Sequence, residues 1–163
     1  MDISIDLKNY APDAPIVHRQ AARALISNQD KYLMIFSKYG DYKFPGGGIK
    51  PGEDPEDALC REVSEETGFA VKKETIQLIG RTHERRKGHN TDVMVMESLY
   101  YGCEVNKIPG ERNLDDYEEE YGYEVVWMNL ESAIEKNKAV TDLEACPWVI
   151  RDTQFMQWLV SNA

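Results

Sequence analysis

The sequence predicts an α/β or α+β sandwich that forms one domain over residues 1–163. The chain has 163 residues, of which 42% are hydrophobic, and this is enough apolar material for a single core. Helical segments occur among strand segments without regular alternation, which favours helices packed on a sheet. No internal repeat, low-complexity tract or long linker divides the chain. A second domain is therefore not expected.

The expected strands are short segments rich in β-branched and aromatic residues. They cover residues 21–27, 32–37, 76–81, 93–105 and 123–128. The first two flank the polar stretch Asn28-Gln29-Asp30, which is typical of a β-hairpin.

Three helices are expected, at residues 55–67, about 130–137 and about 148–160. Asp54 is a favoured N-cap, Pro55 suits the first helical position, and Gly68 is a suitable terminator, so the first helix has well-defined ends. The last helix carries an apolar face at helical spacing, which predicts core packing. That face consists of Trp148, Phe155, Trp158 and Leu159.

The charge balance limits the function classes. With 19 basic and 29 acidic residues, the chain has a formal net charge of −10, which argues against unaided binding to a nucleic-acid backbone. An anionic substrate would need metal ions as a bridge. Without a long apolar segment or a signal-peptide pattern, a cytoplasmic location without membrane attachment is expected. The three cysteines, Cys60, Cys103 and Cys146, are expected to be reduced thiols. A homodimer is compatible with this sequence.

Acidic residues in the first helix are arranged unfavourably for an isolated helix. Glu62, Glu65 and Glu66 share one arc that borders the expected buried face, and Glu62 repels Glu66 at a spacing of four residues. Negative charge in the last turn also opposes the helix dipole. Bound Mg²⁺ or Mn²⁺ would resolve this conflict, although a merely acidic surface explains the pattern equally well. The preceding residues 46–48 are glycines, which suit either close approach to a ligand or a tight turn.

The segment around this helix resembles the Nudix box, the motif of the Nudix hydrolase family. The motif reads Gly, five residues, Glu, seven residues, Arg-Glu, an aliphatic residue, any residue, Glu-Glu, any residue, Gly and a hydrophobic residue. Its defined positions are filled by Gly47, Glu53, Arg61, Glu62, Val63, Glu65, Glu66, Gly68 and Phe69. The resemblance extends loosely over residues 20–160 and implies a Nudix-type α/β/α sandwich with a mixed β-sheet, preceded by an extension at residues 1–18.

The resemblance also implies a function and a set of site residues. Family members hydrolyse a nucleoside diphosphate linked to another group, with Mg²⁺ or Mn²⁺. Glu62, Glu65 and Glu66 would be the metal ligands and catalytic acids, and Gly46 would hold the backbone near the metal. The supporting residues of the box would be Gly47, Glu53 and Arg61, the last two as an ion pair.

A general base is expected either among the box glutamates or in the acidic loop before Trp127. The loop contains Glu118, Glu119 and Glu120, and of these Glu120 is the preferred candidate. A solvated loop with no catalytic part explains the same three residues.

The expected substrate contacts come from outside the box. The basic run at residues 81–90 suits phosphate binding, and strand alternation would point Arg81 and Arg85 toward the substrate and Arg86 away from it. A solvated hairpin tip is an equally good interpretation. Tyr42 and Phe44 are candidates for stacking on a nucleotide base.

Two alternatives remain open. A Nudix-like domain that binds a ligand or a protein without catalysis would normally lack a box acid, whereas all are present here. Isomerisation of allylic diphosphates occurs on the same fold and needs a reactive cysteine, for which Cys103 is the candidate.

Overall fold

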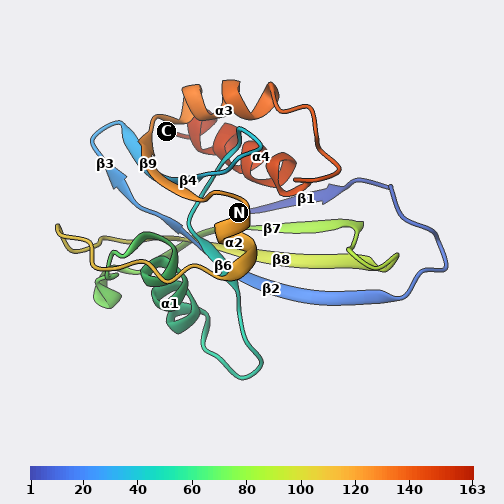
Figure 1. The fold of residues 1–163 in the computed structure, drawn as a ribbon, viewed down its shortest axis with the longest axis horizontal. Helices are drawn as coiled ribbons and strands as arrows, with labels where there is room; N and C mark the ends of the chain where they lie inside the picture. The colour runs from blue at the N-terminus through green and yellow to red at the C-terminus, as the bar shows by residue number, and fades with distance from the viewer.

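A five-stranded mixed sheet forms the centre of the computed structural model, which describes residues 1–163 (Figure 1). Its strands follow the order β1-β7-β8-β2-β6. They are β1 (Asp2–Asp6), β2 (Ile16–Leu25), β6 (Gly46–Gly48), β7 (Gln77–Lys87) and β8 (Val93–Gly102). The β1–β7 and β2–β8 pairs are parallel, whereas β7–β8 and β2–β6 are antiparallel. The short strand β6 is therefore an edge of this sheet.

A smaller antiparallel sheet completes the strand layer. It contains β3 (Ser27–Asn28), β4 (Lys31–Phe36), β5 (Tyr42–Lys43) and β9 (Glu124–Met128). The expected hairpin exists between β3 and β4, with Ser27 opposite Tyr32 and Gln29 in the left-handed region at φ 58°. The longer strand β2 pairs elsewhere, with β6 and β8.

Helices cover both faces of the strand layer, as expected for an α/β/α sandwich. They are α1 (Pro55–Thr67), η1 (Lys73–Thr75), α2 (Asp116–Glu120), α3 (Leu130–Lys138) and α4 (Trp148–Ser161). Figure 1 shows α1 below the sheet and the pair α3 and α4 above it. None of these helices combines the length and the apolar character that a membrane span requires.

Alternation along β2 divides the core into two layers. Ala22 and Ala24 face α1 and pack with Leu59 and Val63, whereas Leu25 packs on the opposite side with residues of α3 and α4. The upper layer contains a stack of Tyr100 on Phe155, with ring centroids 3.7 Å apart. Helix α1 packs against β2 and β6 on one side of the sheet, so the acidic residues of α1 lie near the β6 edge.

The sequence prediction missed several elements at the margins of the expected ones. Strand β1 pairs with β7 in an N-terminal segment that was expected to be an extension, and α2 forms in the expected acidic loop. Strand β7 continues to Lys87, beyond the expected end at Arg81. Its polar side chains obscured the pattern, because both faces of this strand carry charged residues.

Candidate active site

Helix α1 has the ends that its sequence predicts. The Asp54 carboxylate accepts a hydrogen bond from the Glu56 backbone N–H at 2.9 Å, and Pro55 occupies the first turn. Gly68 ends the helix in the left-handed conformation, at φ 78°. These caps fix the phase of the helix, and thereby the direction in which its glutamates point.

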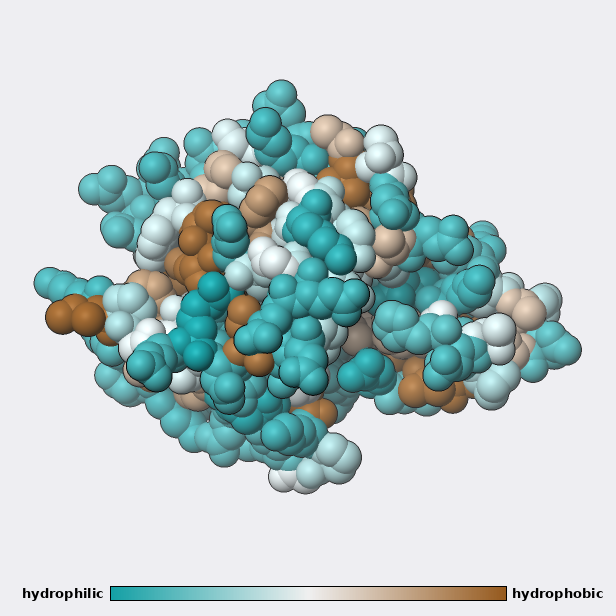
Figure 2. All heavy atoms as spheres, viewed as in Figure 1, coloured by the Kyte–Doolittle hydropathy of each residue, from teal (hydrophilic) through white to brown (hydrophobic).

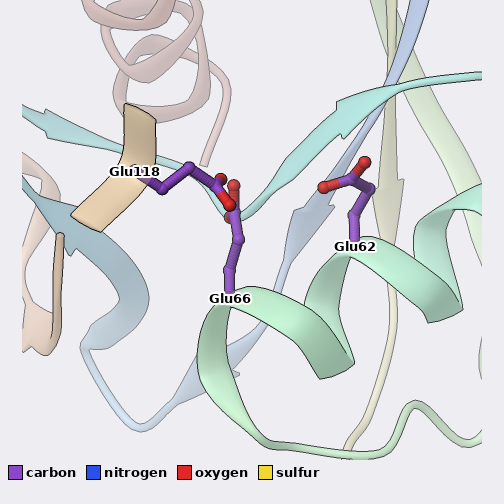
Figure 3. A group of neighbouring side chains, drawn as sticks. All are labelled: Glu62, Glu66 and Glu118. Atoms are coloured by element: carbon purple, nitrogen blue, oxygen red, sulfur yellow. The ribbon is translucent and has the colours of Figure 1, made fainter. Parts of the chain in front are cut away.

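Three carboxylates converge beside α1, next to the β6 edge of the sheet (Figure 3). Glu62 and Glu66 come from α1 and Glu118 comes from α2, and one oxygen atom from each lies within 4.8 Å of the others. Figure 3 shows the Glu66 and Glu118 side chains pointing at one another, with Glu62 one turn away along α1. Three carboxylate oxygens this close together are suitable ligands for a divalent cation such as Mg²⁺.

Glu66 is the most perturbed member of this three-acid cluster. Its side chain is 1% exposed, accepts a hydrogen bond from the Gly46 N–H at 3.0 Å, and lies 3.9 Å from the Lys43 ammonium. Burial, together with the adjacent Glu118 carboxyl, raises the pKa of Glu66 to about 8 despite the opposing effect of Lys43. Burial also raises the pKa of Glu62. A divalent cation would favour the charged forms that this arrangement disfavours.

Two glycines let the β6 backbone approach the cluster. Gly46 has φ 145°, and a Cβ atom there would lie 2.1 Å from the Ala22 carbonyl oxygen. A Cβ atom on Gly47 would lie 2.6 Å from the Glu62 carboxyl carbon. Gly46 therefore excludes any side chain, because the clash is with the backbone, and its contact to the cluster is made through its N–H. A side chain at position 47 would instead displace the Glu62 carboxylate from its place in the cluster.

Arg61 ties the loop before α1 to the cluster. Its guanidinium forms two hydrogen bonds of 2.9 Å to the Glu53 carboxylate, which is the expected ion pair. It also donates to Glu62 at 2.8 Å and to the Gly48 carbonyl at 3.0 Å. The hydrogen bonds from Arg61 lower the pKa of Glu53 to about 2. One side chain thus orients a cluster member and holds the loop.

Glu65 and Glu120 do not belong to the three-acid cluster, although both were candidates. Glu65 contacts Arg61 at 3.4 Å and keeps 29% of its side chain exposed. Glu120 is exposed, and the acidic segment instead contributes Glu118. Two residues apart on a helix, side chains point in nearly opposite directions, so only one of the two can face the cluster. The spacing of Asp115 and Glu118 was an available signal, since Glu118 accepts the Asp115 backbone N–H as in a capping box.

The basic run has the reverse of its expected orientation. Arg86 and Glu84 point under α4, with Arg86 6% exposed, whereas Arg81 is exposed on the opposite face of the sheet. Arg85 shares the face of Arg81 and donates a hydrogen bond of 2.8 Å to the Tyr10 hydroxyl. The alternation itself was correct, but α4 covers the face that was expected to point away from the substrate.

The expected stacking residues are also placed elsewhere. Phe44 is fully buried and makes edge contacts with Tyr100 and Phe155, so it belongs to the core. Tyr42 packs against Phe36 with ring centroids 5.0 Å apart. Neither side chain lines the cleft beside the cluster.

That cleft has a volume of about 400 Å³ and runs from Gly46–Gly48 across β2, β8 and β7 to the start of α4. Its aromatic wall consists of Tyr117, Tyr121, Tyr123 and Trp148. Trp148 stacks on Tyr121 with centroids 5.8 Å apart, and its indole N–H donates to Asp41 at 2.8 Å. Trp148 was expected in the core with the rest of the α4 face, and only Phe155 of that face is fully buried. The Trp148 position, at the first turn of α4, carried no sequence signal for a cleft.

The cysteines show no sign of activation. Burial raises the pKa of Cys103 to about 12, and the same cause raises that of Cys146 to about 12. Neither thiol lines the cleft. The arrangement therefore gives no support to the isomerase alternative.

Comparisons with known proteins agree with this geometry. The sequence profile of a family described as "NUDIX domain" matches residues 17–149. A protein named RNA pyrophosphohydrolase from Thioalkalivibrio sulfidiphilus is 35% identical over 82 residues, which are 49% of this chain and 42% of that protein. Nudix hydrolase 2 of Arabidopsis thaliana is 28% identical over 117 residues, which are 68% of this chain and 40% of that protein. The matched segments thus cover less than half the length of these relatives.

Solved structures share the fold. A NUDIX hydrolase from Nitrosomonas europaea superposes with a TM-score of 0.59 and 24% identity, covering 85% of this chain and 89% of that one. A MutT NUDIX hydrolase from Burkholderia pseudomallei gives a TM-score of 0.56 and 21% identity, covering 71% and 85%.

Proposed function

The chain belongs to the Nudix family, and we propose that it is a divalent-metal-dependent hydrolase that cleaves the diphosphate bond of a nucleotide or nucleotide derivative. The observation that carries the proposal is the convergence beside a cleft of two acids of a complete Nudix box, Glu62 and Glu66, with Glu118 of α2. The relatives named RNA pyrophosphohydrolase support the same reaction class. Their name also places RNA that carries a pyrophosphate bond among the substrates worth testing.

The donor set of the three-acid cluster fits Mg²⁺ or Mn²⁺. It offers carboxylate oxygens within 4.8 Å of one another, on a helix that would otherwise suffer like-charge repulsion. When bound, the cation would neutralise charge on the diphosphate and activate the attacking water. Arg61 would keep Glu62 in place through its 2.8 Å hydrogen bond.

The reaction itself is a substitution at phosphorus. The water oxygen forms a new bond to one phosphorus, the bond from that phosphorus to the bridging oxygen breaks, and its electron pair leaves with the bridging oxygen. An ionised carboxylate of the cluster takes the proton that the water loses. The Gly46 N–H donates to Glu66 and so fixes one of these carboxylates against the edge of the sheet.

A panel assay tests the proposal. The purified full chain is incubated with nucleoside diphosphates, triphosphates, diphosphate-linked nucleotide conjugates and 5′-triphosphorylated RNA, with Mg²⁺, with Mn²⁺ or with excess chelator. We expect cleavage of at least one substrate that needs the metal. Full turnover in chelator, or binding without turnover for every substrate, would refute the proposal, and the second result would favour the non-catalytic alternative.

Glu66→Gln is the decisive variant, and Glu56→Gln is its matched control on the same helix. Glu66→Gln keeps the side-chain shape and removes the ligand charge, so we expect turnover to fall by about 100-fold or more, in the range seen when a catalytic group is lost. Glu56 lies outside the cluster, and its variant is expected to retain turnover.

A further inference from the structure

The cleft beside the three-acid cluster is strongly basic, although the chain as a whole has a net charge of −10. The Lys and Arg side chains that line it are Arg19, Arg23, Lys43, Arg86 and Arg151. They come from β2, β5, β7 and α4, elements that lie far apart in the sequence. The tertiary structure thus gathers a local excess of positive charge where a substrate would extend from the cluster.

Three of these five cations already have acidic partners in the protein, and one of them is Lys43, which lies 3.9 Å from Glu66. Glu84 bridges Arg86 at 2.6 Å and Arg151 at 3.1 Å, and Asp152 pairs with Arg151 at 3.2 Å. Asp152 also accepts the Tyr100 hydroxyl at 2.8 Å. The two buried acids are therefore committed to Arg86, Arg151 and Tyr100.

Arg23 is different because it is 5% exposed and forms no ion pair. Its Nε donates to the Ser98 hydroxyl at 3.1 Å, and its Nη2 lies 3.6 Å from the Met96 sulfur. Its third nitrogen, Nη1, makes no hydrogen bond within the protein. Asp152 attracts it at longer range, while Lys43 and Arg86 repel it. Nη1 is not sealed from solvent, because Thr82 Oγ1 is the only fully buried side-chain nitrogen or oxygen without a partner. It therefore stays accessible in the cleft that Arg23 lines. A mostly buried charge without an ion pair is costly, usually by several kcal/mol.

We infer that Arg23 is the anchor of a second anion subsite, which binds a phosphate of the substrate other than the diphosphate held at the three-acid cluster. This inference rests on the proposed function for the identity of the substrate. Arg23 and Gly46 are direct partners across β2 and β6, so the subsite and the cluster are neighbours. The stacked Tyr121 and Trp148 form a wall of the same cleft. The substrate class is thus a nucleotide with at least three phosphoryl groups, or with a phosphate elsewhere, and a base placed against the aromatic wall.

Phosphate binding to the chelator-treated full chain tests the subsite by itself. In chelator no metal ion remains to hold phosphate at the three-acid cluster, so the part of the phosphate binding that depends on Arg23 reports the basic cleft. We expect measurable binding, a Kd raised about 10- to 100-fold in Arg23→Gln as for the loss of a charge-assisted hydrogen bond, and partial rescue in Arg23→Lys. Arg81→Gln, which removes an exposed cation from the opposite face, should leave the Kd unchanged. Equal Kd values in wild type and Arg23→Gln would overturn the inference.

Thermal unfolding without phosphate controls for folding of the variant. Removing an unpaired buried charge should leave the melting temperature of Arg23→Gln equal to or above that of the wild type. Added phosphate should raise the melting temperature of the wild type but not of Arg23→Gln. A variant that is destabilised and still stabilised by phosphate would show that Arg23 is compensated within the protein, and would contradict the inference.

Kinetics connect the subsite to substrate choice. The ratio of kcat/KM for a nucleoside triphosphate to that for the matching diphosphate should fall at least tenfold in Arg23→Gln, whereas an unchanged ratio would contradict selection by Arg23. Phosphate binding that depends on Arg23 in a chain without hydrolase activity would refute the proposed function and leave the subsite standing. Hydrolase activity without phosphate binding that depends on Arg23 would refute the subsite and leave the proposed function standing.

Discussion

At the residue scale, Arg61 shows how one guanidinium serves both loop and site. Its planar fork meets the Glu53 carboxylate with two hydrogen bonds, and its other donors reach Glu62 and the Gly48 carbonyl. A lysine at this position would supply charge without the fixed geometry. The pair is therefore a structural requirement for the orientation of a cluster carboxylate, and Glu53 itself stays outside the cluster.

This pair predicts a change in stability at acid pH. The folded-state pKa of Glu53, about 2, lies below the ordinary value of 4.5. Its contribution to the free energy of unfolding is therefore fully present above pH 4.5 and is lost as the pH falls toward 2. Urea denaturation across this range should show a shallower loss of stability in Glu53→Gln than in the wild type. Glu74→Gln, at an exposed acid without an ion pair, should keep the wild-type slope, and parallel slopes in all three proteins would contradict the prediction.

At the element scale, α1 depends on a sharp end to keep its glutamates in phase. Gly68 has φ 78°, its N–H donates to the Ser64 carbonyl at 2.9 Å, and the Gly110 backbone packs directly against it. Only glycine satisfies both the left-handed conformation and the close approach. The end of α1 is thereby locked to the segment that leads into α2, which carries Glu118.

Substitution of two glycines separates these effects. Gly52 has a similar φ of 77°, and no atom lies within 4 Å of the position that a Cβ atom would take there. A Cβ atom on Gly68, in contrast, would lie 2.2 Å from the Gly110 carbonyl oxygen. Gly52→Ala should therefore lower the free energy of unfolding by about 1 kcal/mol through conformation alone. Gly68→Ala should cost clearly more, with a lower turnover. Chemical denaturation measures the free energy of unfolding, and the panel assay measures turnover. Equal losses of unfolding free energy in the two variants would argue against a contribution from packing on Gly110.

At the scale of the whole molecule, the face drawn in Figure 2 is mostly hydrophilic. Figure 2 shows small, separate hydrophobic patches on the face that it presents. The net charge of −10 is not distributed evenly, since the acids of α1 and α2 meet a basic cleft at the edge of the sheet. A metal ion at that junction would join α1 to α2 through their carboxylates, and it would be joined to β6 through the hydrogen bond from Gly46 to Glu66.

Metal binding should therefore stabilise the whole fold. Added Mg²⁺ should raise the melting temperature of the wild type, because it binds the folded chain in preference to the unfolded one. Glu118→Gln should reduce this rise, whereas Glu120→Gln, two residues along α2, should preserve it. A reduced rise in Glu120→Gln with a normal one in Glu118→Gln would instead favour Glu120, the residue that the sequence alone indicates.

The sequence by itself determined the caps of α1, the pairing of Arg61 with Glu53, the family resemblance and the general sandwich architecture. The caps and the architecture depend on neighbours in the chain and on short-range periodicity, which a sequence displays directly. The pairing of Arg61 with Glu53 followed from the family resemblance, which rests on the spacing of the motif. Only the tertiary structure decided that Glu118 joins the cluster, that Arg86 rather than Arg81 lines the cleft, and that Trp148 leaves the core. Each depends on which face of a strand or helix another element covers. The same holds for Arg23, because only the folded structure shows that its side chain is mostly buried and forms no ion pair.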